Sequence, residues 1–284
     1  AEDGWYRALR PDGSEKWSLG FQASAAPALG TNGWVYVASQ GGPLYAVTNG
    51  TIAWQRDLGG TFRCSPVIGP DGTIYAGGNQ RWLRAFQPDG KELWGREMDA
   101  PVLGLALDAD ATIYAAVGRW LVAVTRTNTL RWTYDSGSGV LSGSPVVAAD
   151  GTIYVTSTQG FLHAVRPDGT RRWRFETAGI PYSTPAIAQD GTVYFGTDDR
   201  VLHGVGPDGI ERWRYEATAS LSSSSPLLTP EGWLYVGGGQ RTLRWFDTQT
   251  PPMPSPWPMQ GRDPARTGNS STPAALRVVL RSPD

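Results

Sequence analysis

The segment Asp71-Gly72-Thr73-Ile74-Tyr75 decides the fold, because close copies of it recur along the 284-residue chain. The copies are Asn32-Gly33-Trp34-Val35-Tyr36, Asp110-Ala111-Thr112-Ile113-Tyr114, Asp150-Gly151-Thr152-Ile153-Tyr154, Asp190-Gly191-Thr192-Val193-Tyr194 and Glu231-Gly232-Trp233-Leu234-Tyr235. Their tyrosines fall 39, 39, 40, 40 and 41 residues apart. A period near forty residues, with strand-forming residues in every copy, predicts the blades of a β-propeller.

Each repeat has the pattern of four short strands. A first strand follows a proline, as in Pro66-Val67-Ile68, and an Asp-Gly pair then turns the chain, because that pair tolerates the positive φ angles of a two-residue turn. The second strand carries the tyrosine, and the third has a Leu-x-Ala-Val pattern, as in 162–165. A second turn, often Pro-Asp-Gly, precedes a fourth strand with a tryptophan. These tryptophans are Trp17, Trp54, Trp94, Trp132, Trp173 and Trp213.

The two ends of the chain divide one repeat between them. Residues 5–17 have the pattern of a third and a fourth strand, whereas Ser271-Thr272-Pro273-Ala274-Ala275 has that of a first strand and 277–280 could supply a second. We therefore predict an all-β propeller of four-stranded antiparallel blades, with seven blades closed by strands from both termini, since closure removes unpaired sheet edges. Six blades with the tail on the surface is the alternative.

This organisation implies a single domain over residues 1–284. The units are a half blade at 1–22, then 23–60, 61–99, 100–139, 140–179, 180–220 and 221–260, with a tail at 261–284 that closes the ring or caps it. Trp257 follows a proline-rich insertion and is expected to be the seventh of the fourth-strand tryptophans. We expect any signal peptide to have been removed before residue 1.

Composition excludes several classes of protein. The chain has 36 Gly and 22 Pro, 40% hydrophobic residues and only 18% charged residues, which is typical of many short strands joined by tight turns. A net charge of −1 gives no support to binding nucleic acid or an anionic membrane. No apolar run reaches the length of a membrane span. The single cysteine, Cys64, excludes an intrachain disulfide, and we expect a monomer.

The turn-and-tryptophan segments resemble a known family. Ala85-Phe-Gln-Pro-Asp-Gly-Lys-Glu-Leu-Trp94 and Ala164-Val-Arg-Pro-Asp-Gly-Thr-Arg-Arg-Trp173 are similar to the docking motif of pyrroloquinoline-quinone-type (PQQ-type) repeat propellers, over roughly residues 5–247. The resemblance implies that each indole packs between adjacent blades. The segment 257–268 resembles an element that flanks many such propellers, which implies a terminal cap.

The sequence offers little catalytic chemistry. Many aspartates precede a turn glycine, where aspartate is favoured for local hydrogen bonding; they are Asp12, Asp71, Asp89, Asp150, Asp168, Asp190 and Asp208. His163 and His203 share one third-strand position, which Tyr45, Arg84 and Arg244 fill elsewhere, so an inter-blade contact with a snorkelling tip is a better interpretation than a metal site. The pair Asp198-Asp199 is interpreted as solvating its loop. No catalytic, cofactor-binding or metal-binding residue is predicted.

The quinone-dependent dehydrogenases of the resembled family use eight blades, a disulfide between adjacent cysteines, calcium ligands and an aspartate base. This chain has one cysteine, too few repeats and no unique acidic set, so we do not expect it to be an enzyme or to hold a cofactor.

One loop position carries a recurring charge. Four units place an arginine between the second and third strands, and two of them place a glutamine before it; these residues are Arg81, Arg119, Arg200, Arg241, Gln80 and Gln240. The turn aspartates belong to the opposite face, so an acidic face and an arginine face are expected. The arginines either shield the rim or bind an acidic partner or an anionic ligand.

The predicted function is a non-enzymatic scaffold or ligand-sensing domain, because the non-catalytic members of the resembled family include a periplasmic scaffold for outer-membrane protein assembly and sensor domains. The resemblance also implies a periplasmic or cell-surface location. A small-ligand binder, of a quinone for example, and an enzyme with its site at the central channel (a lyase or a hydrolase) are the alternatives.

Overall fold

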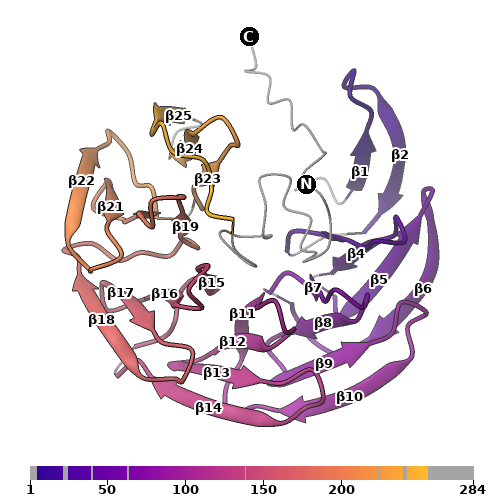
Figure 1. The fold of residues 1–284 in the computed structure, drawn as a ribbon. Coiled ribbons are helices and arrows are strands. Elements are labelled where there is room, and N and C mark those ends of the chain that lie inside the picture. Colours follow the sequence, from indigo (N-terminus) through magenta and orange to yellow (C-terminus); the bar gives the residue numbers. More distant parts are fainter. Residues whose placement is uncertain are drawn as a thin grey trace.

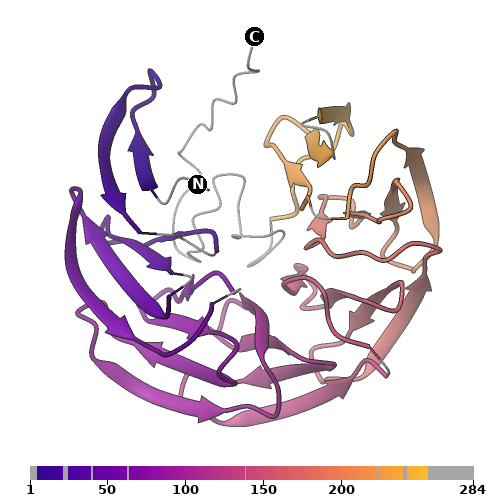
Figure 2. The same ribbon diagram turned by 180° about the vertical axis from the view of Figure 1, so that it is seen from behind.

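The computed structural model of the chain describes residues 5–21, 25–39, 41–62, 64–137, 139–222, 224–238 and 242–254. These residues form seven antiparallel sheets that follow one another around a ring, as Figures 1 and 2 show from its two sides. Five sheets have four strands, one has three and one has two within the described residues. The all-β, seven-bladed propeller predicted from the repeats is confirmed.

We number the sheets as blades 1–7 in chain order. Blade 1 holds β1 (Trp5–Leu9) and β2 (Glu15–Gly20). Blade 2 holds β3 (Ala28–Leu29), β4 (Val35–Ala38), β5 (Pro43–Thr48) and β6 (Thr51–Asp57). Blade 3 holds β7 (Val67–Ile68), β8 (Ile74–Gly77), β9 (Trp82–Phe86) and β10 (Glu92–Glu97). Blade 4 holds β11 (Val102–Leu107), β12 (Ile113–Val117), β13 (Trp120–Val124) and β14 (Leu130–Asp135).

The remaining blades repeat the pattern. Blade 5 holds β15 (Val146–Val147), β16 (Ile153–Ser157), β17 (Phe161–Val165) and β18 (Arg171–Glu176). Blade 6 holds β19 (Ala186–Ile187), β20 (Val193–Gly196), β21 (Val201–Val205) and β22 (Glu211–Glu216). Blade 7 holds β23 (Leu227–Leu228), β24 (Trp233–Gly238) and β25 (Thr242–Asp247). The first strand of each full blade lies nearest the ring axis and the fourth strand lies at the rim (Figure 1).

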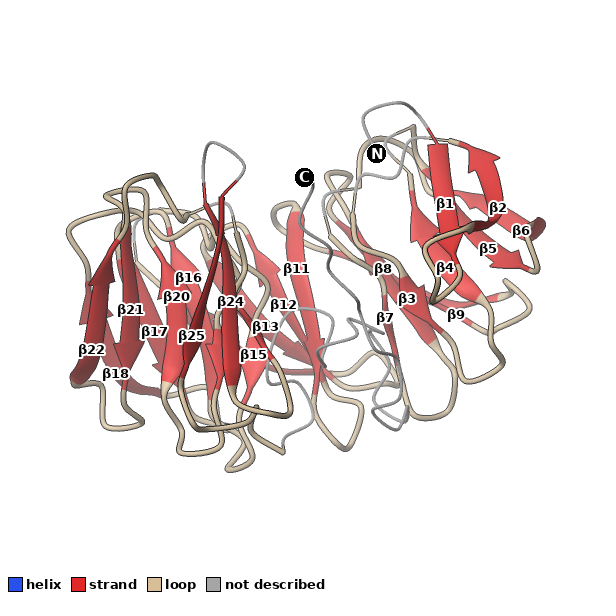
Figure 3. Ribbon diagram, turned by 90° about the horizontal axis from the view of Figure 1, so that it is seen from above, coloured by secondary structure: helices blue, strands red, loops and turns tan. Residues whose placement is uncertain are grey.

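The antiparallel order of the strands gives the ring two distinct faces (Figure 3). The turns between first and second strands, and between third and fourth strands, lie on one face, which we call the turn face. The turns between second and third strands and the connections between blades lie on the other, which we call the loop face. The seven turn aspartates belong to the turn face, and Oδ1 of each accepts a hydrogen bond from the backbone N–H two residues later.

The repeat's tyrosine and tryptophan meet within a blade because a small residue stands between them. In blade 5, Tyr154 pairs with Ala164 and Ala164 pairs with Trp173, so all three side chains lie on the same face of the sheet. The methyl group of Ala164 leaves room for the two rings, whose centroids are 5.5 Å apart. Equivalent pairs in blades 2, 3, 4 and 6 have centroids 5.7–6.0 Å apart. This explains the alanine of the third-strand pattern.

The tryptophans also reach the next blade. Nε1 of Trp54 donates a hydrogen bond of 2.8 Å to the carbonyl oxygen of Pro88 in the following turn, and the same bond joins Trp94 to Arg126, Trp132 to Pro167 and Trp173 to Pro207. A Cβ at Gly90 would lie 2.7 Å from the Trp54 ring, so only glycine lets the indole approach that turn. A Cβ at Gly50 would likewise lie 2.7 Å from the Trp17 side chain. The ring centroids of Trp213 and Phe246 are 5.2 Å apart.

The first strands are joined across blades by residues that precede a proline. The N–H of Ala26 donates to Oγ of Ser65, that of Ser144 to Oγ1 of Thr184, and that of Thr184 to Oγ of Ser225. The hydroxyl residue of the Ser/Thr-Pro pattern therefore links one blade to the next near the ring axis.

The chain beyond β25 does not continue to a fourth strand within the described residues. Pro252 instead forms a bridge with Ala188 of blade 6, and the N–H of Met253 donates to the carbonyl oxygen of Ile187 at 2.9 Å. The Met253 sulfur accepts a bond from the N–H of Ala149 in blade 5. The proline-rich insertion thus returns to the inner strands of earlier blades. Trp257, the tail segment 261–284 and the closing strands predicted in 271–280 lie outside the described residues.

Candidate functional site

Three of the four predicted arginines occupy equivalent places on the loop face. The carbonyl oxygen of Arg81 accepts a hydrogen bond of 2.6 Å from the N–H of Met98, just after the fourth strand of its blade. Arg119 and Arg200 accept the same bond from Ser136 and Ala217. All three arginine side chains are exposed. Arg241 and Gln240 lie outside the described residues.

The backbone at this position gives arginine no advantage. Gly42 and Gly160 fill it in blades 2 and 5, with φ of 111° and 77°, and make the same hydrogen bond. Arg81 and Arg200 have φ of 61° and 74°, a left-handed conformation that costs a residue with a Cβ about 1 kcal/mol or more. Glycine would therefore adopt the backbone conformation of this turn with less strain than arginine.

One arginine has clear intrachain partners. A guanidinium nitrogen of Arg119 lies 3.0 Å from a carboxylate oxygen of Asp135, and the guanidinium lies 4.5 Å from the Trp120 ring centroid. About half of the Arg119 side chain is still exposed, so this ion pair contributes little to stability. The rim-shielding interpretation fits Arg119 best.

The loop face also carries carboxylates that the repeat analysis missed. The fourth strands of blades 2–6 all end in an acidic residue, and these residues are Asp57, Glu97, Asp135, Glu176 and Glu216. Each stands three positions after the tryptophan, a Trp-x-x-Asp/Glu pattern that is visible in the sequence. The turn aspartates do lie on the opposite face, but the expected separation of charge is wrong, because arginines and carboxylates share the loop face.

The adjacent pair Asp198-Asp199 is engaged by its own loop. Oδ1 of Asp198 accepts the N–H of Ile180 at 2.7 Å, and Oδ1 of Asp199 accepts the Thr197 hydroxyl. Among the described residues, no group of three or more His, Cys, Asp or Glu side chains is placed to hold a metal ion. Burial raises the pKa of the Cys64 thiol to about 12, so the reactive thiolate is scarce at neutral pH.

The two histidines lie at blade junctions but do not snorkel. His163 is fully buried, with Nδ1 3.1 Å from the hydroxyl of Tyr134 in blade 4 and Nε2 3.1 Å from Oγ of Ser157. Burial, together with the nearby charges of Arg174 and Arg171, lowers the pKa of His163 to about 4. The interpretation of an inter-blade contact holds, whereas the exposed tip expected of a snorkelling side chain is absent because the imidazole finds hydrogen-bond partners inside.

His203 repeats this arrangement with an acidic partner. Its Nδ1 lies 2.6 Å from Oε1 of Glu211, and its ring stacks on Phe195 with centroids 5.2 Å apart. Burial lowers the pKa of His203, and the hydrogen bond to Glu211 opposes that effect.

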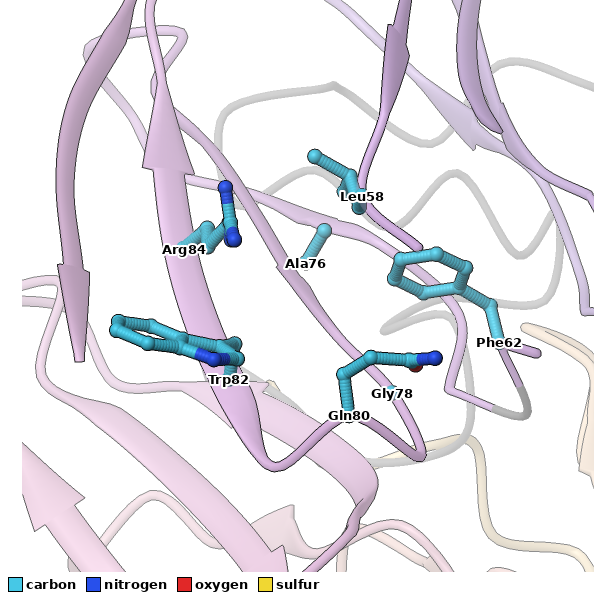
Figure 4. Close-up of a pocket in the computed structure, with 7 residues that line it drawn as sticks. All are labelled: Leu58, Phe62, Ala76, Gly78, Gln80, Trp82 and Arg84. Atoms are coloured by element: carbon cyan, nitrogen blue, oxygen red, sulfur yellow. The ribbon is translucent and has the colours of Figure 1, made fainter. Parts of the chain in front are cut away.

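Gln80 lies at the rim of a small pocket between blades 2 and 3, shown in Figure 4. Leu58 and Phe62 come from the connection between the blades, and Trp82 and Arg84 come from β9. Ala76 and Gly78 complete the wall. The void measures about 200 Å³ together with its open mouth. Nε of Arg84 is buried there and has no hydrogen-bond partner among the described residues.

The pocket can bind a group that has an apolar body and one acceptor atom. Phe62 is buried, and the Arg84 guanidinium lies 5.2 Å from the Trp82 ring centroid. The charge of Arg84 is already balanced by Glu92, 3.3 Å away. Gln80 was predicted to lie on the loop face beside Arg81, and nothing in the sequence indicated the pocket.

No helix among the described residues is long and apolar enough to cross a membrane.

Comparison with known proteins places the repeats in a family. A comparison with curated proteins gives no match. Among solved structures, the crystal structure of BamB from Moraxella catarrhalis matches with a TM-score of 0.70 and 19% sequence identity, over 85% of this chain and 76% of that one. At this identity the likeness shows the shared fold. The family model described as outer membrane protein assembly factor BamB matches residues 2–126 and 117–250. Because these matches span most of the chain, it belongs to the BamB-like PQQ-repeat propeller family.

Proposed function

We propose that this chain is a non-enzymatic interaction scaffold that binds a protein partner on the loop face of the propeller, outside the cytoplasm. The family model is named for an assembly factor of outer membrane proteins, which supports both the scaffold role and an extracytoplasmic location. Fold similarity alone does not define a function, so the proposal depends on a surface feature of this chain.

That feature is the set of arginines between second and third strands. Arg81 and Arg200 keep exposed guanidinium groups on a backbone position that glycine fills in blades 2 and 5. A charge kept at a conformational cost in a loop is better explained by what faces it than by the packing beneath it. Because carboxylates share the face, we expect a partner surface with charges of both signs and an acidic segment opposite the arginines.

The test is a variant with serine at Arg81, Arg119, Arg200 and Arg241, used as bait with extract of the source organism. The matched control replaces four exposed turn-face arginines, Arg10, Arg126, Arg131 and Arg166, and so removes the same charge from the opposite face. The proposal predicts that partner capture is lost only with the loop-face variant, at unchanged melting temperature. If both variants capture the partner equally well, the loop-face arginines shield the rim and do not bind a partner.

Small-ligand binding remains the second candidate, favoured by the pocket between blades 2 and 3. An enzymatic role has no supporting observation among the described residues.

A further inference from the structure

Three junctions between the described blades have a pair of facing side chains that includes an aromatic ring. One is the residue two positions after the tryptophan, and the other is the middle residue of the next blade's third strand. In the junction of blades 4 and 5 these are Tyr134 and His163, with ring centroids 5.9 Å apart. In that of blades 5 and 6 they are Phe175 and His203, also 5.9 Å apart. An aromatic ring thus fills the space in front of the third strand.

The junction of blades 6 and 7 shows how an arginine accepts such a ring. Nη1 of Arg244 donates a hydrogen bond of 2.8 Å to the hydroxyl of Tyr215. The guanidinium also lies 5.6 Å from the Tyr215 ring centroid, within the range of a cation–π contact. A phenol therefore satisfies both the donor and the face of an arginine at this position.

The junction of blades 2 and 3 has the arginine but lacks the ring. Arg56 pairs with Leu44 just as Tyr215 pairs with Leu202, so Arg56 holds the position of the tyrosine, and Arg84 holds that of Arg244. Arg56 turns to the next blade, where its Nε donates to the carbonyl oxygen of Gly90 at 2.8 Å, just as Arg96 at the same position of blade 3 turns to Asn128 of blade 4. The pocket of Figure 4 lies in front of Arg84, with Arg56 outside its lining.

The chemistry of the pocket matches the missing group. Nε of Arg84 is a buried donor without a partner among the described residues, and leaving such a donor unpaired is costly. Phe62 and Trp82 supply aromatic walls, and apart from its open mouth the void has room for about one water-sized atom. A ligand would place one oxygen in that space and its ring in the open mouth. Because Glu92 already balances the Arg84 charge, a neutral acceptor suits the site better than a second anion.

We propose that this pocket receives a tyrosine side chain of the protein partner, whose phenol oxygen accepts a hydrogen bond from Nε of Arg84. The inference depends on the proposed scaffold function for the source of the tyrosine. The pocket chemistry can be tested without the partner, with p-cresol as the probe.

The experiment follows the indole N–H resonance of Trp82 by NMR while p-cresol or toluene is added. We expect a saturable shift with p-cresol at millimolar concentration and binding of toluene about fivefold weaker, because toluene lacks the acceptor oxygen. Arg84→Lys keeps the ion pair to Glu92 but removes Nε, so the preference for p-cresol should disappear. No saturable shift, or equal binding of both probes, overturns the proposal.

The clearest test is a variant that fills the pocket with a side chain of the protein itself. Arg56→Tyr recreates the Tyr215–Arg244 pair, so it should raise the melting temperature and abolish p-cresol binding. Arg56→Ala is the matched control, because it also loses the bond to Gly90 but leaves the pocket open, and it should bind p-cresol as the parent does. If Arg56→Tyr melts at or below the temperature of Arg56→Ala and still binds p-cresol, the pocket is not the place of a missing aromatic ring.

The proposed loop-face scaffold and the proposed tyrosine pocket can be disproved independently of each other. The four-site loop-face variant alters no residue that lines the pocket, so p-cresol should bind it normally whether or not it captures a partner. Loss of partner capture in Arg56→Tyr, with capture kept in Arg56→Ala, supports the partner as the source of the tyrosine. Capture kept by both variants, with p-cresol binding lost in Arg56→Tyr, limits the pocket to small phenols and overturns the partner tyrosine.

Discussion

Trp173 donates a hydrogen bond of 2.9 Å from Nε1 to the carbonyl oxygen of Pro207 in the next blade. The same indole lies against Gly209 of that turn and against Tyr154 of its own blade. One half-buried side chain thus connects the second strand of one blade to the turn of its neighbour.

Replacing this indole should weaken the whole ring. Trp173→Ala removes contacts to both blades, and we expect a loss of about 3 kcal/mol in the free energy of unfolding. Trp173→Phe keeps most of the ring area but loses the donor, which should cost about 1 kcal/mol beyond the lost area. Urea titrations of both variants and of Trp94→Ala measure these effects. Melting temperatures within a couple of degrees of the parent would refute the docking role.

Gly209 should resist substitution more strongly than another turn glycine of the same conformation. Gly209 has φ of 83° and Gly13 has φ of 84°. A Cβ at Gly209 would lie 2.8 Å from the Trp173 ring, whereas nothing lies within 4 Å of one at Gly13. Gly13→Ala should cost about 1 kcal/mol for its backbone conformation, and Gly209→Ala should cost about 1–3 kcal/mol more for overpacking. Equal losses in thermal unfolding would show that the indole can move aside.

Acid should destabilise the fold through His163. Its pKa is about 4 when folded and about 6.5 when unfolded, so the unfolded chain binds more protons between these values. Stability is then greatest above pH 6.5 and falls as the pH drops towards 4, by up to about 3 kcal/mol from this residue. His163→Gln should have a flatter stability profile between pH 7 and 4, whatever its stability at pH 7. Parallel urea-denaturation profiles for parent and variant would contradict this assignment.

Arg119 should contribute little to stability despite its ion pair with Asp135. Both side chains are more than a third exposed, and such pairs are worth about 0–1 kcal/mol. Arg119→Ser is therefore expected to melt within about two degrees of the parent, with the difference shrinking further in high salt. A larger loss would mean that this arginine is structural, and it would have to be left intact in the loop-face variant.

Removal of residues 270–284 should expose sheet edges. Blade 1 has only two strands among the described residues, and Trp5 and Leu9 of β1 are 46% and 62% exposed. The Ser-Thr-Pro segment at 271–273 repeats the one at 183–185, whose Thr184 links blades 5, 6 and 7. The truncated protein should unfold at lower temperature and self-associate, as measured by calorimetry and light scattering. A stable monomer would instead favour a tail that covers no edge.

The strands could be predicted closely because their signals are local. Asp-Gly at 71–72 forms a turn through contacts within a few residues, and the tyrosine and tryptophan mark the second and fourth strands by simple alternation. The path of 250–253 could not be predicted, since a proline-rich segment has no periodicity to follow. Its course depends on Pro252 and Met253 meeting Ala188 and Ile187 of the neighbouring blade 6.

The candidate site was only partly predictable for the same reason. The arginine position is a repeat feature, so Arg81, Arg119 and Arg200 could be found by alignment of the units, and the carboxylates three residues after each tryptophan could have been found in the same way. The pocket could not be predicted, because it depends on how Arg56 of blade 2 and Arg84 of blade 3 are placed relative to each other. Arg56 and Arg84 look unremarkable in their own repeats.

The sequence by itself determined the repeat, the strand order and the faces on which turns and loops lie, because hydrogen bonds within turns and the alternation of side chains along a strand act over a few residues. Only the tertiary structure decided that His163 is buried and that the space before Arg84 is open. Those properties depend on which side chains of neighbouring blades meet, about thirty residues apart, as Tyr134 and His163 do. Arg56 does not fill the junction, because its guanidinium group finds an acceptor in the carbonyl oxygen of Gly90 in the next blade.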